Sequence, residues 1–263
     1  MHQLDYFMLA VIIITRLADV WCGDDVDYCD SKMCPYQGKH VACGKTKVKF
    51  SDKCQGEPKL EDMEPYIQLI EDETNYYRNR LASGKVKCFY PAARMPSVQW
   101  DPALAETAEY NVKSCVFAHD ECRSTKKFRM AGQNIYTAKT KNLDIPVKGF
   151  IKEAILLWFD EQVDANLTVL KSYHKTSPQT GHFTLLVSDR QTYIGCAFLN
   201  NLLPGPPVKR MVIFTCNYSS SNFRNIPSYK PGPPASQCKK RHRIFESLCA
   251  ERIDPDDLSW YKY

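Results

Sequence analysis

After its first residues, the sequence has no apolar run long enough to span a lipid bilayer. The one early run, Phe7–Ile14, has the length of the apolar core of a signal peptide. It is far shorter than the roughly 20 residues that a membrane helix needs. We therefore assign residues 1–22 to a signal peptide, with cleavage expected between Ala18 and Gly23. The mature chain is expected to be secreted, without integral membrane association.

The common catalytic and nucleic-acid signatures are also missing. The chain has no Gly-x-Ser-x-Gly or His-Glu-x-x-His motif, no phosphate-binding glycine loop and no paired Cys-x-x-Cys motifs of the kind that hold zinc. A net charge of +5 over 263 residues is small, whereas nucleic-acid binding usually needs a concentrated basic face. The basic run 239–243 could hold an anionic glycan or a membrane surface, but such runs are more often solvated. We expect no nucleic-acid partner and no enzyme of these classes.

Cysteine, by contrast, is abundant, with 12 residues in the chain. An even number of cysteines behind a signal peptide is typical of disulfides formed in an oxidising compartment. Two Asn-x-Ser/Thr sequons, at Asn166 and Asn217, are expected to be glycosylated if they are exposed. Asn217 is the weaker candidate because it follows a cysteine within a strand-like run. The sequence thus predicts a disulfide-bonded extracellular glycoprotein.

Composition divides the chain into four parts. The signal peptide is followed at 23–60 by a cysteine-rich N-terminal extension with little apolar periodicity. Residues 61–223 carry the periodic apolar patterns and form the body of the protein. Residues 224–263 begin with a Pro/Gly-rich stretch, which cannot be helical and is typical of a linker, and end in a short basic tail.

Three helices are predicted in the body, followed by strands. The first helix has an apolar stripe from Tyr66 to Leu81, the second begins with the N-cap Asp101, and the third follows Pro146. Strands are predicted at three later runs rich in β-forming residues: 183–187, 193–199 and 210–218. Helices followed by strands favour an α+β architecture in which helices pack on an antiparallel sheet.

Extending the helical stripes brings titratable side chains toward the core. Helical steps from the second helix lead through Cys115 to His119, and one step beyond Trp158 of the third helix is Glu161. His182 lies where a loop is expected to enter a strand. Two histidines and a glutamate could hold a divalent metal such as zinc. Alternatively, they could hydrogen-bond one another and brace the helices against the sheet. Spacing alone favours this bracing role.

Four stretches of sequence carry a resemblance to a known family. They are YCDSKMC at 28–34 with HVAC at 40–43, CVFAHDEC at 115–122 with AGQNI at 131–135, GHFT at 181–184, and IFTCNY at 213–218 continuing to Asn222. Together they resemble the CAP superfamily of cysteine-rich secretory proteins, venom antigens and plant pathogenesis-related proteins. The antigen 5-like proteins of insects are the members that the chain resembles most. The similarity runs from about Asp27 to Phe223, which is most of the mature chain.

The resemblance implies a three-layer α-β-α sandwich of the CAP type with a disulfide-stapled N-terminal extension. It also implies a cleft lined by two histidines and two acidic residues, which fall at His119, Gln133, Glu161 and His182. Gln133 departs from the pattern and removes both a charge and a general base. His119 and His182 are the implied ligands if a divalent metal such as zinc is bound, although no cofactor is required.

A disulfide pattern is implied as well. The resemblance pairs Cys29–Cys43, Cys34–Cys122, Cys54–Cys115 and Cys196–Cys216, and Cys238–Cys249 is the natural pair in the tail. Cys22 and Cys88 remain. They can pair only if the signal peptide is cleaved before Cys22, and otherwise Cys88 is an odd thiol.

These observations predict a secreted, monomeric CAP protein of the antigen 5 type that is not an enzyme. It is expected to bind a small hydrophobic ligand such as a lipid or sterol, or an extracellular partner protein. Neither kind of binding needs a catalytic residue, so both tolerate the departure at Gln133. The alternatives are a metal-assisted hydrolase that uses His119, His182 and Glu161, and a purely structural extracellular protein in which the four cleft residues brace the fold.

Overall fold

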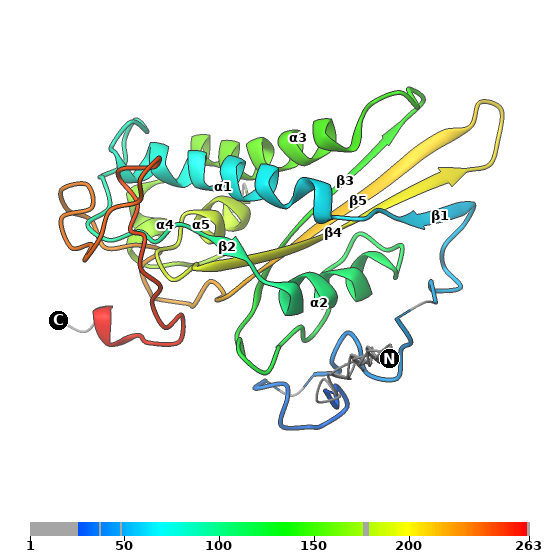
Figure 1. The fold of residues 1–263 in the computed structure, drawn as a ribbon, viewed down its shortest axis with the longest axis horizontal. Coiled ribbons are helices and arrows are strands. Elements are labelled where there is room, and N and C mark those ends of the chain that lie inside the picture. Colours follow the sequence, from blue (N-terminus) through cyan, green and yellow to red (C-terminus); the bar gives the residue numbers. More distant parts are fainter. Residues whose placement is uncertain (1–25, 37, 48, 176–178, 262–263) are drawn as a thin grey trace, which may run out of the picture.

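A five-stranded sheet runs through the centre of the protein (Figure 1). The computed structural model describes residues 26–261 except 37, 48 and 176–178, so the predicted signal peptide and Cys22 lie outside the described residues. The strand order is β1-β4-β5-β3 with antiparallel pairing, and the short β2 pairs in parallel with β4. The strands are β1 (Glu57–Leu60), β2 (Gln99–Trp100), β3 (Gly132–Thr140), β4 (Tyr193–Leu203) and β5 (Lys209–Tyr218).

Helices cover both faces of this sheet (Figure 1). One layer holds α1 (Ile67–Ala82), α3 (Val147–Asp160), α4 (Leu167–Lys171) and α5 (Gly181–Leu186); the other holds α2 (Pro102–Val112). Single 3-10 turns occur at η1 (Glu64–Tyr66), η2 (Glu161–Val163) and η3 (Ser259–Tyr261). The predicted three-layer α-β-α sandwich is therefore confirmed. None of the helices described is long and apolar enough to cross a membrane.

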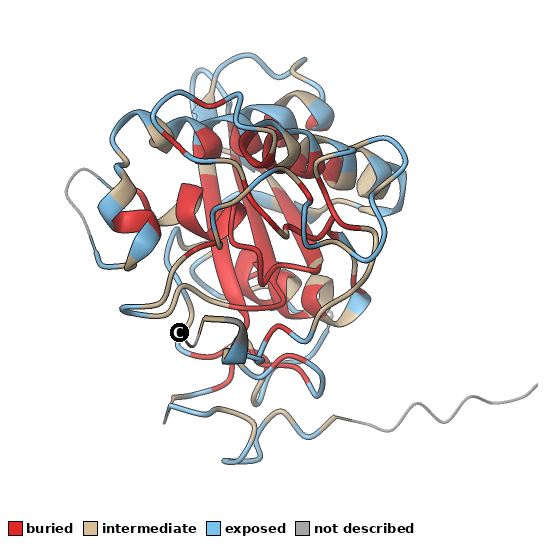
Figure 2. Ribbon diagram, turned by 90° about the vertical axis from the view of Figure 1, so that its left-hand side faces the viewer, coloured by how far each residue is buried: buried red, intermediate tan, exposed pale blue. Residues whose placement is uncertain are grey.

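Alternation along the strands divides the core between the two faces. Phe198 of β4 packs on the side of α1 and α3, whereas its neighbour Leu199 packs with Ile213 on the side of α2, as expected for the period of two along a strand. Trp158 of α3 stacks on Phe214 of β5 with ring centroids 5.7 Å apart. Figure 2 shows that buried residues concentrate in the sheet and on the helix faces turned toward it.

The predicted helices are confirmed, with one change of boundary. The carboxylate of Asp101 accepts the N–H groups of Ala103 and Leu104 at 3.0 and 3.1 Å and so caps α2. This helix ends at Val112, and at Cys115 the backbone adopts a φ of 56°, which a helix cannot continue through. The prediction that the helical stripe carries His119 inward to the core is therefore wrong: that residue lies in the loop after the helix and is exposed.

The strand predicted at 183–187 is also wrong, because most of these residues form α5. The carboxylate of Glu161 accepts the N–H groups of His182 and Phe183 at 2.8 and 3.1 Å. It thereby satisfies two of the donors that a helix leaves free at its start. The strands predicted at 193–199 and 210–218 are confirmed as parts of β4 and β5, whereas β3 was not predicted.

The N-terminal extension is irregular up to residue 56 and then supplies the edge strand β1. Disulfides tie it to itself and to the turn that follows α2. The structure has the bonds Cys29–Cys43, Cys34–Cys122, Cys54–Cys115, Cys196–Cys216 and Cys238–Cys249. These are the five pairs expected from the sequence. Cys88 is exposed and bonds to no other described cysteine.

The described C-terminal residues, 224–261, pack against the body of the protein and do not form the free linker and tail that their composition predicts. Tyr229 and Leu248 are only 4% and 0% exposed and belong to the main core. The hydroxyl of Tyr229 donates to the Tyr90 carbonyl at 2.7 Å, and the N–H of Cys249 donates to the Met95 carbonyl at 2.8 Å. The described tail is therefore packed against the loop between α1 and β2.

Arg78 of α1 is completely buried and joins three parts of the chain. Its Nε and Nη2 groups donate to the Pro96 carbonyl at 3.3 and 2.6 Å. The remaining donors reach the carbonyl of Leu186, the last residue of α5, at 2.7 Å, and those of Ser188 and Gln191 in the loop after it, at 2.8 and 3.0 Å. Burial lowers the pKa of Arg78 to about 10, so the guanidinium is charged at neutral pH and all five of its N–H donors are used.

We predict that Arg78→Lys destabilises the protein by about 3 kcal/mol, because an ammonium group cannot reach these carbonyls together and leaves some of them unpaired. Chemical denaturation of the oxidised protein would measure the loss. Arg80→Lys is the matched control on the exposed face of the same helix, and it should stay within about 0.5 kcal/mol of the wild type. Equal effects of the two changes would contradict this role of Arg78.

His40 in the N-terminal extension is buried and hydrogen-bonded in one tautomer. Its Nε2 lies 2.8 Å from the Ser124 carbonyl and donates to it, whereas its Nδ1 accepts the Ala42 N–H at 3.1 Å. Protonation of Nδ1 would set two donors against each other. Burial lowers the pKa of His40 below its ordinary value, although the Ser124 hydrogen bond acts in the opposite direction.

This lowered pKa predicts that the protein loses stability as the pH falls. The unfolded chain takes up the His40 proton near pH 6.5, before the folded chain does, so protons shift the equilibrium toward unfolding from there down to the folded pKa. Melting temperatures between pH 7.5 and pH 5 should therefore fall less steeply in His40→Gln than in the wild type. The same change at the exposed His174 should leave the slope unaltered, and an unaltered slope in His40→Gln would refute the assignment.

Candidate functional site

A cleft of about 400 Å³ opens between the turn after α2, the start of β3 and the start of α5. His119, Gln133 and His182, three of the four residues expected there, line it. Other lining side chains are Arg123, Asn134, Tyr173, Lys175, Gln179 and Asn222. Glu161 does not line the cleft but lies behind His182, to which it is hydrogen-bonded. The fold thus brings the four predicted residues together, with the glutamate in a supporting position.

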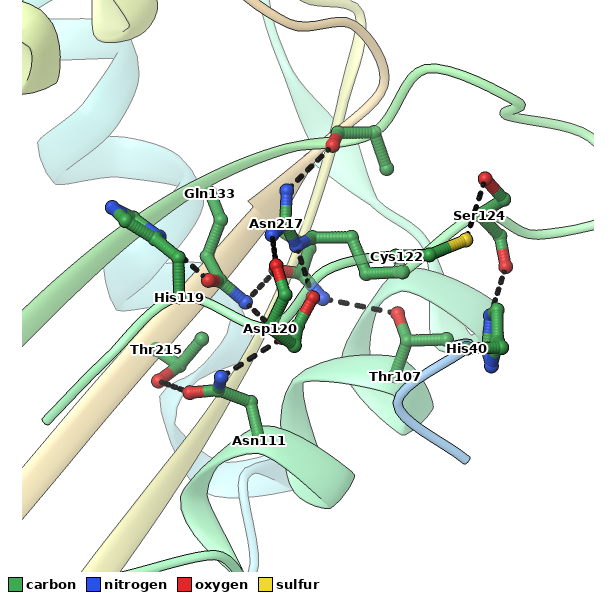
Figure 3. A network of polar contacts seen from close by, with 12 residues as sticks. His40, Thr107, Asn111, His119, Asp120, Cys122, Ser124, Gln133, Thr215 and Asn217 are labelled. Atoms are coloured by element: carbon green, nitrogen blue, oxygen red, sulfur yellow. Dashed lines mark hydrogen bonds and ion pairs between the residues drawn. The ribbon is translucent and has the colours of Figure 1, made fainter. Parts of the chain in front are cut away.

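Asp120 holds the half of the cleft that contains His119. Its Oδ2 accepts Nε2 of Gln133 at 2.9 Å and Nδ2 of Asn111 at 2.8 Å, and its Oδ1 accepts Nε of Arg123 at 2.6 Å (Figure 3). An ionised carboxylate can only accept, so the amide nitrogen of Gln133 must face it. A carboxylate therefore sits beside Gln133, although none occupies position 133 itself.

The orientation of Gln133 fixes the tautomer of His119 (Figure 3). The Gln133 nitrogen also donates to Oδ1 of Asn217 at 3.0 Å, which leaves its carbonyl oxygen 2.7 Å from Nδ1 of His119. A carbonyl oxygen only accepts, so Nδ1 carries the proton and Nε2 of the neutral ring is a lone pair. The walls of the cleft remove water from the ring and lower the pKa of His119; the Gln133 hydrogen bond opposes this and Arg123 adds to it.

Glu161 holds the other half of the cleft. Its Oε2 accepts the two N–H groups at the start of α5, and its Oε1 lies 2.7 Å from Nδ1 of His182. Both oxygens therefore have partners within the protein, and the Glu161 side chain is only 17% exposed. This arrangement leaves Nε2 of His182 without a hydrogen bond to any described residue, as it does for His119.

The donors available do not fit a tightly held zinc ion. The cleft offers two imidazole Nε2 atoms, while both oxygens of Glu161 and the oxygen of Gln133 are already bound. Protein zinc sites usually have three or four protein ligands, so this set is at least one ligand short. Elsewhere in the described chain, Cys238, Cys249 and Glu251 cluster, but the two cysteines are joined in a disulfide and supply no thiolate.

Sequence reasoning missed Asp120 and Arg123 as parts of the site. Asp120 lies within the 115–122 segment that carried the resemblance, but the residue after His119 on a continuous helix would point away from it. Once α2 ends at Val112, Arg123 can line the cleft and Asp120 can hold Gln133 beside it. A break in the helix was the missing information, and the sequence has neither glycine nor proline at that point to signal it.

The structure separates the two candidate glycosylation sites. Asn217 is 0% exposed, and its Nδ2 donates to the Leu104 carbonyl and to Oγ1 of Thr107 at 3.3 and 3.0 Å. A glycan on this nitrogen has no space in the folded protein, so Asn217 does not meet the condition of exposure on which its glycosylation was expected. Asn166 is exposed and caps α4 through its oxygen, which leaves the nitrogen free of hydrogen bonds to described residues.

Comparison with known sequences places most of the chain in one group. The sequence model of the cysteine-rich secretory protein family, CAP, matches residues 71–218. Venom allergen-1 of Aedes albopictus is 34% identical over 86% of this chain and 88% of its own length. Antigen 5 like allergen Cul n 1 of Culicoides nubeculosus is 37% identical over 66% and 84%, and Tabinhibitin 3 of Tabanus yao is 32% identical over 95% of each.

Solved structures show the same fold at lower identity. NaASP2, in a crystal structure with Zn²⁺, has a TM-score of 0.58 at 22% identity, covering 76% of this chain and all of that one. Na-ASP-1 has a TM-score of 0.57 at 21% identity, covering 79% of this chain and 52% of that one. These similarities support the sandwich architecture and leave the chemistry of the cleft to the residues described above.

We predict that Gln133→Glu, which restores the acidic residue, destabilises this protein. The change places a second carboxylate against Asp120 and removes the donors to Asp120 and Asn217, at an expected cost of about 2 kcal/mol at pH 7.5. Part of this loss should disappear at pH 5, where the carboxylates can share a proton. Denaturation at both values of pH measures it.

Gln179→Glu is the control, because Gln179 is an exposed residue of the same cleft. It should change stability little at either pH. If Gln133→Glu were as stable as the wild type at pH 7.5, Asp120 would not hold the amide as the structure shows.

Proposed function

Because the chain belongs to the cysteine-rich secretory protein (CAP) family, we propose that it is a secreted protein that acts by binding an extracellular partner and catalyses no reaction. The five disulfides fit an extracellular protein, and the apolar run at the N-terminus supports secretion. The relatives named above are called allergens or an inhibitor, which is compatible with a binding role. The hydrogen bonds of the cleft support the absence of catalytic activity.

The observation that carries this proposal is the internal use of every acidic group near the histidines. Glu161 accepts three hydrogen bonds from α5 and His182, and Asp120 accepts from Gln133, Asn111 and Arg123. Neither carboxylate is available as a general base for a water molecule in the cleft. A metal-assisted hydrolase would also lack a third metal ligand. The arrangement instead presents a fixed surface with polar edges, as a binding site requires.

The shape and polarity of the cleft support a protein partner. A second groove of about 280 Å³ shares Arg123, Ser221 and Asn222 with the cleft, so the two adjoin, and we call them together the depression. Its lining includes Arg129, Arg224 and the 74% exposed Tyr36, and Glu121 is the one acidic residue among its lining residues. Aromatic and arginine side chains are enriched at protein interfaces. An extended acidic segment of an extracellular protein fits this depression better than a small hydrophobic ligand does.

We expect peptides selected from a random displayed library against the full oxidised protein to be acidic and to bind in this depression. Arg129→Glu with Arg224→Glu should abolish their binding. Lys139→Glu with Lys141→Glu, an equal change of charge at exposed positions of the sheet edge and the turn after it, should preserve it. Surface plasmon resonance would compare the three proteins.

Mass spectrometry of the incubated peptides separates binding from catalysis. The proposal expects intact peptides after prolonged incubation. Cleaved peptides, with cleavage lost in the His119→Ala and His182→Ala double variant, would establish a hydrolase and overturn it. Selection of peptides that bind equally well to the Arg129/Arg224 variant would show that the depression is not the binding surface.

A further inference from the structure

The end of the described chain forms an acidic segment whose charge is opposite to that of the arginines in the depression. Residues 254–261 carry three aspartates, Asp254, Asp256 and Asp257, and no lysine or arginine. All three aspartates are exposed. The segment ends in η3, which Figure 1 shows in red beside the sandwich. Its position relative to the depression follows from two anchors.

A buried hydrogen bond anchors the start of the segment. Pro255 is buried, and its carbonyl accepts the hydroxyl of Ser220 at 3.3 Å. Ser220 directly precedes Ser221, which lines both parts of the depression. The acidic segment therefore begins next to the wall that the cleft and the second groove share.

The side chain of Tyr261 anchors the other end. Its hydroxyl bonds to the buried carboxylate of Asp189, and its ring centre lies 5.3 Å from the guanidinium of Arg190. The same guanidinium lies 5.4 Å from the ring centre of Phe223 and donates to the Ser221 carbonyl at 3.4 Å. Phe223 and Ser221 both line the second groove, so Arg190 connects the segment to the wall of the depression.

The charge of the segment reaches an arginine of the depression. Burial and the nearby Asp254 raise the pKa of Asp256, and the guanidinium of Arg129 opposes them. Arg129 also lines the second groove. The attraction is mutual, so Asp256 reduces the positive potential that Arg129 offers to an acidic ligand. None of the described residues from 254 onward lines either part of the depression, so the segment acts through its charge and leaves the space open.

We propose that residues 254–261 are an intramolecular competitor of the acidic partner, in that their aspartates weaken the binding of an acidic segment to the depression. This inference rests on the proposed function, because it takes an acidic partner as the ligand. A strongly acidic partner overcomes the repulsion, whereas weakly acidic proteins are rejected, which makes binding more selective. A purely structural role of the segment would depend on its two anchors and not on the charges of Asp256 and Asp257.

Neutralising two of the exposed aspartates separates these roles. Asp256→Asn with Asp257→Asn keeps both anchors, and an asparagine oxygen can still accept the Ser259 N–H that Asp257 accepts at 2.8 Å. We expect a fluorescein-labelled hexaglutamate peptide to bind this variant of the full oxidised protein about fivefold more tightly than the wild type at low ionic strength. Asp62→Asn with Asp144→Asn, an equal change of charge at exposed positions elsewhere, should stay within about twofold of the wild type. Fluorescence anisotropy measures the affinities, and melting temperatures show that each variant is folded.

A change at Arg129 identifies where the segment acts. Arg129→Gln should remove most of the gain from Asp256→Asn with Asp257→Asn, because the changes on the two sides share one interaction. A gain that persists in full when Arg129 is changed would place the effect on another surface and overturn the inference.

The results also separate this inference from the proposed function. Equal affinities of the wild type and the neutralised variant, with binding lost in Arg129→Glu with Arg224→Glu, would overturn the inference and leave the binding role of the depression intact. Binding that is unaffected by the Arg129 and Arg224 changes would refute both. If neither protein bound hexaglutamate, the competitor role would be refuted, because arginines freed of the aspartates should hold an acidic peptide. The library-selected peptides would still decide the proposed function.

Discussion

The buried guanidinium of Arg78 connects α1 to the chain before β2 and to the end of α5, and the positions of these segments determine the position of the cleft. It is buried in α1, yet within the described chain it bonds only to backbone carbonyls, which lie before β2, at the end of α5 and in the loop between α5 and β4. That loop continues into Asp189, which accepts the Tyr261 hydroxyl and the Lys230 N–H, so the C-terminal segment is fastened to the same point. Burial raises the pKa of Asp189. The hydrogen bonds that this carboxylate accepts and the charges of nearby arginines act in the opposite direction. A charge that is costly to bury is thus used to fix the end of α5, and with it the position of His182.

The cleft is built from two halves with the same logic and different chemistry. Glu161 directly holds Nδ1 of His182, whereas Asp120 acts on His119 through the neutral amide of Gln133. An amide between carboxylate and imidazole orients the ring without adding a second charge beside it. As a result, Nδ1 of each imidazole has a hydrogen-bond partner within the protein, and each carboxylate accepts its hydrogen bonds from protein donors. The glutamine at position 133 therefore leaves the cleft ordered although the expected acidic residue is missing.

The architecture and the members of the site could largely be predicted from the sequence, because they depend on local patterns and on a specific resemblance. The N-cap at Asp101 and the strands β4 and β5 follow from capping and β-rich composition. The errors arose where tertiary contacts decide. Residues 183–186 are helical, and Glu161, which is distant in sequence, accepts the first N–H groups of that helix. The Pro/Gly-rich segment packs on the core through Tyr229 and Leu248. Periodicity cannot reveal such contacts in so short a stretch. The role of Asp120 was missed because it depends on where α2 ends, and no breaker in the sequence marks that end.

The central claim is that the carboxylates of the cleft are committed to internal hydrogen bonds and that Gln133 fixes the tautomer of His119. Two-dimensional proton–nitrogen correlation spectra of the ¹⁵N-labelled imidazoles would test it directly. At pH 7.5 the account predicts a neutral His119 ring that is protonated on Nδ1, with Nε2 as a bare lone pair, in the wild type but not uniformly in Gln133→Leu. A His119 ring protonated on Nε2, a charged ring, or a mixture of tautomers in the wild type would contradict it.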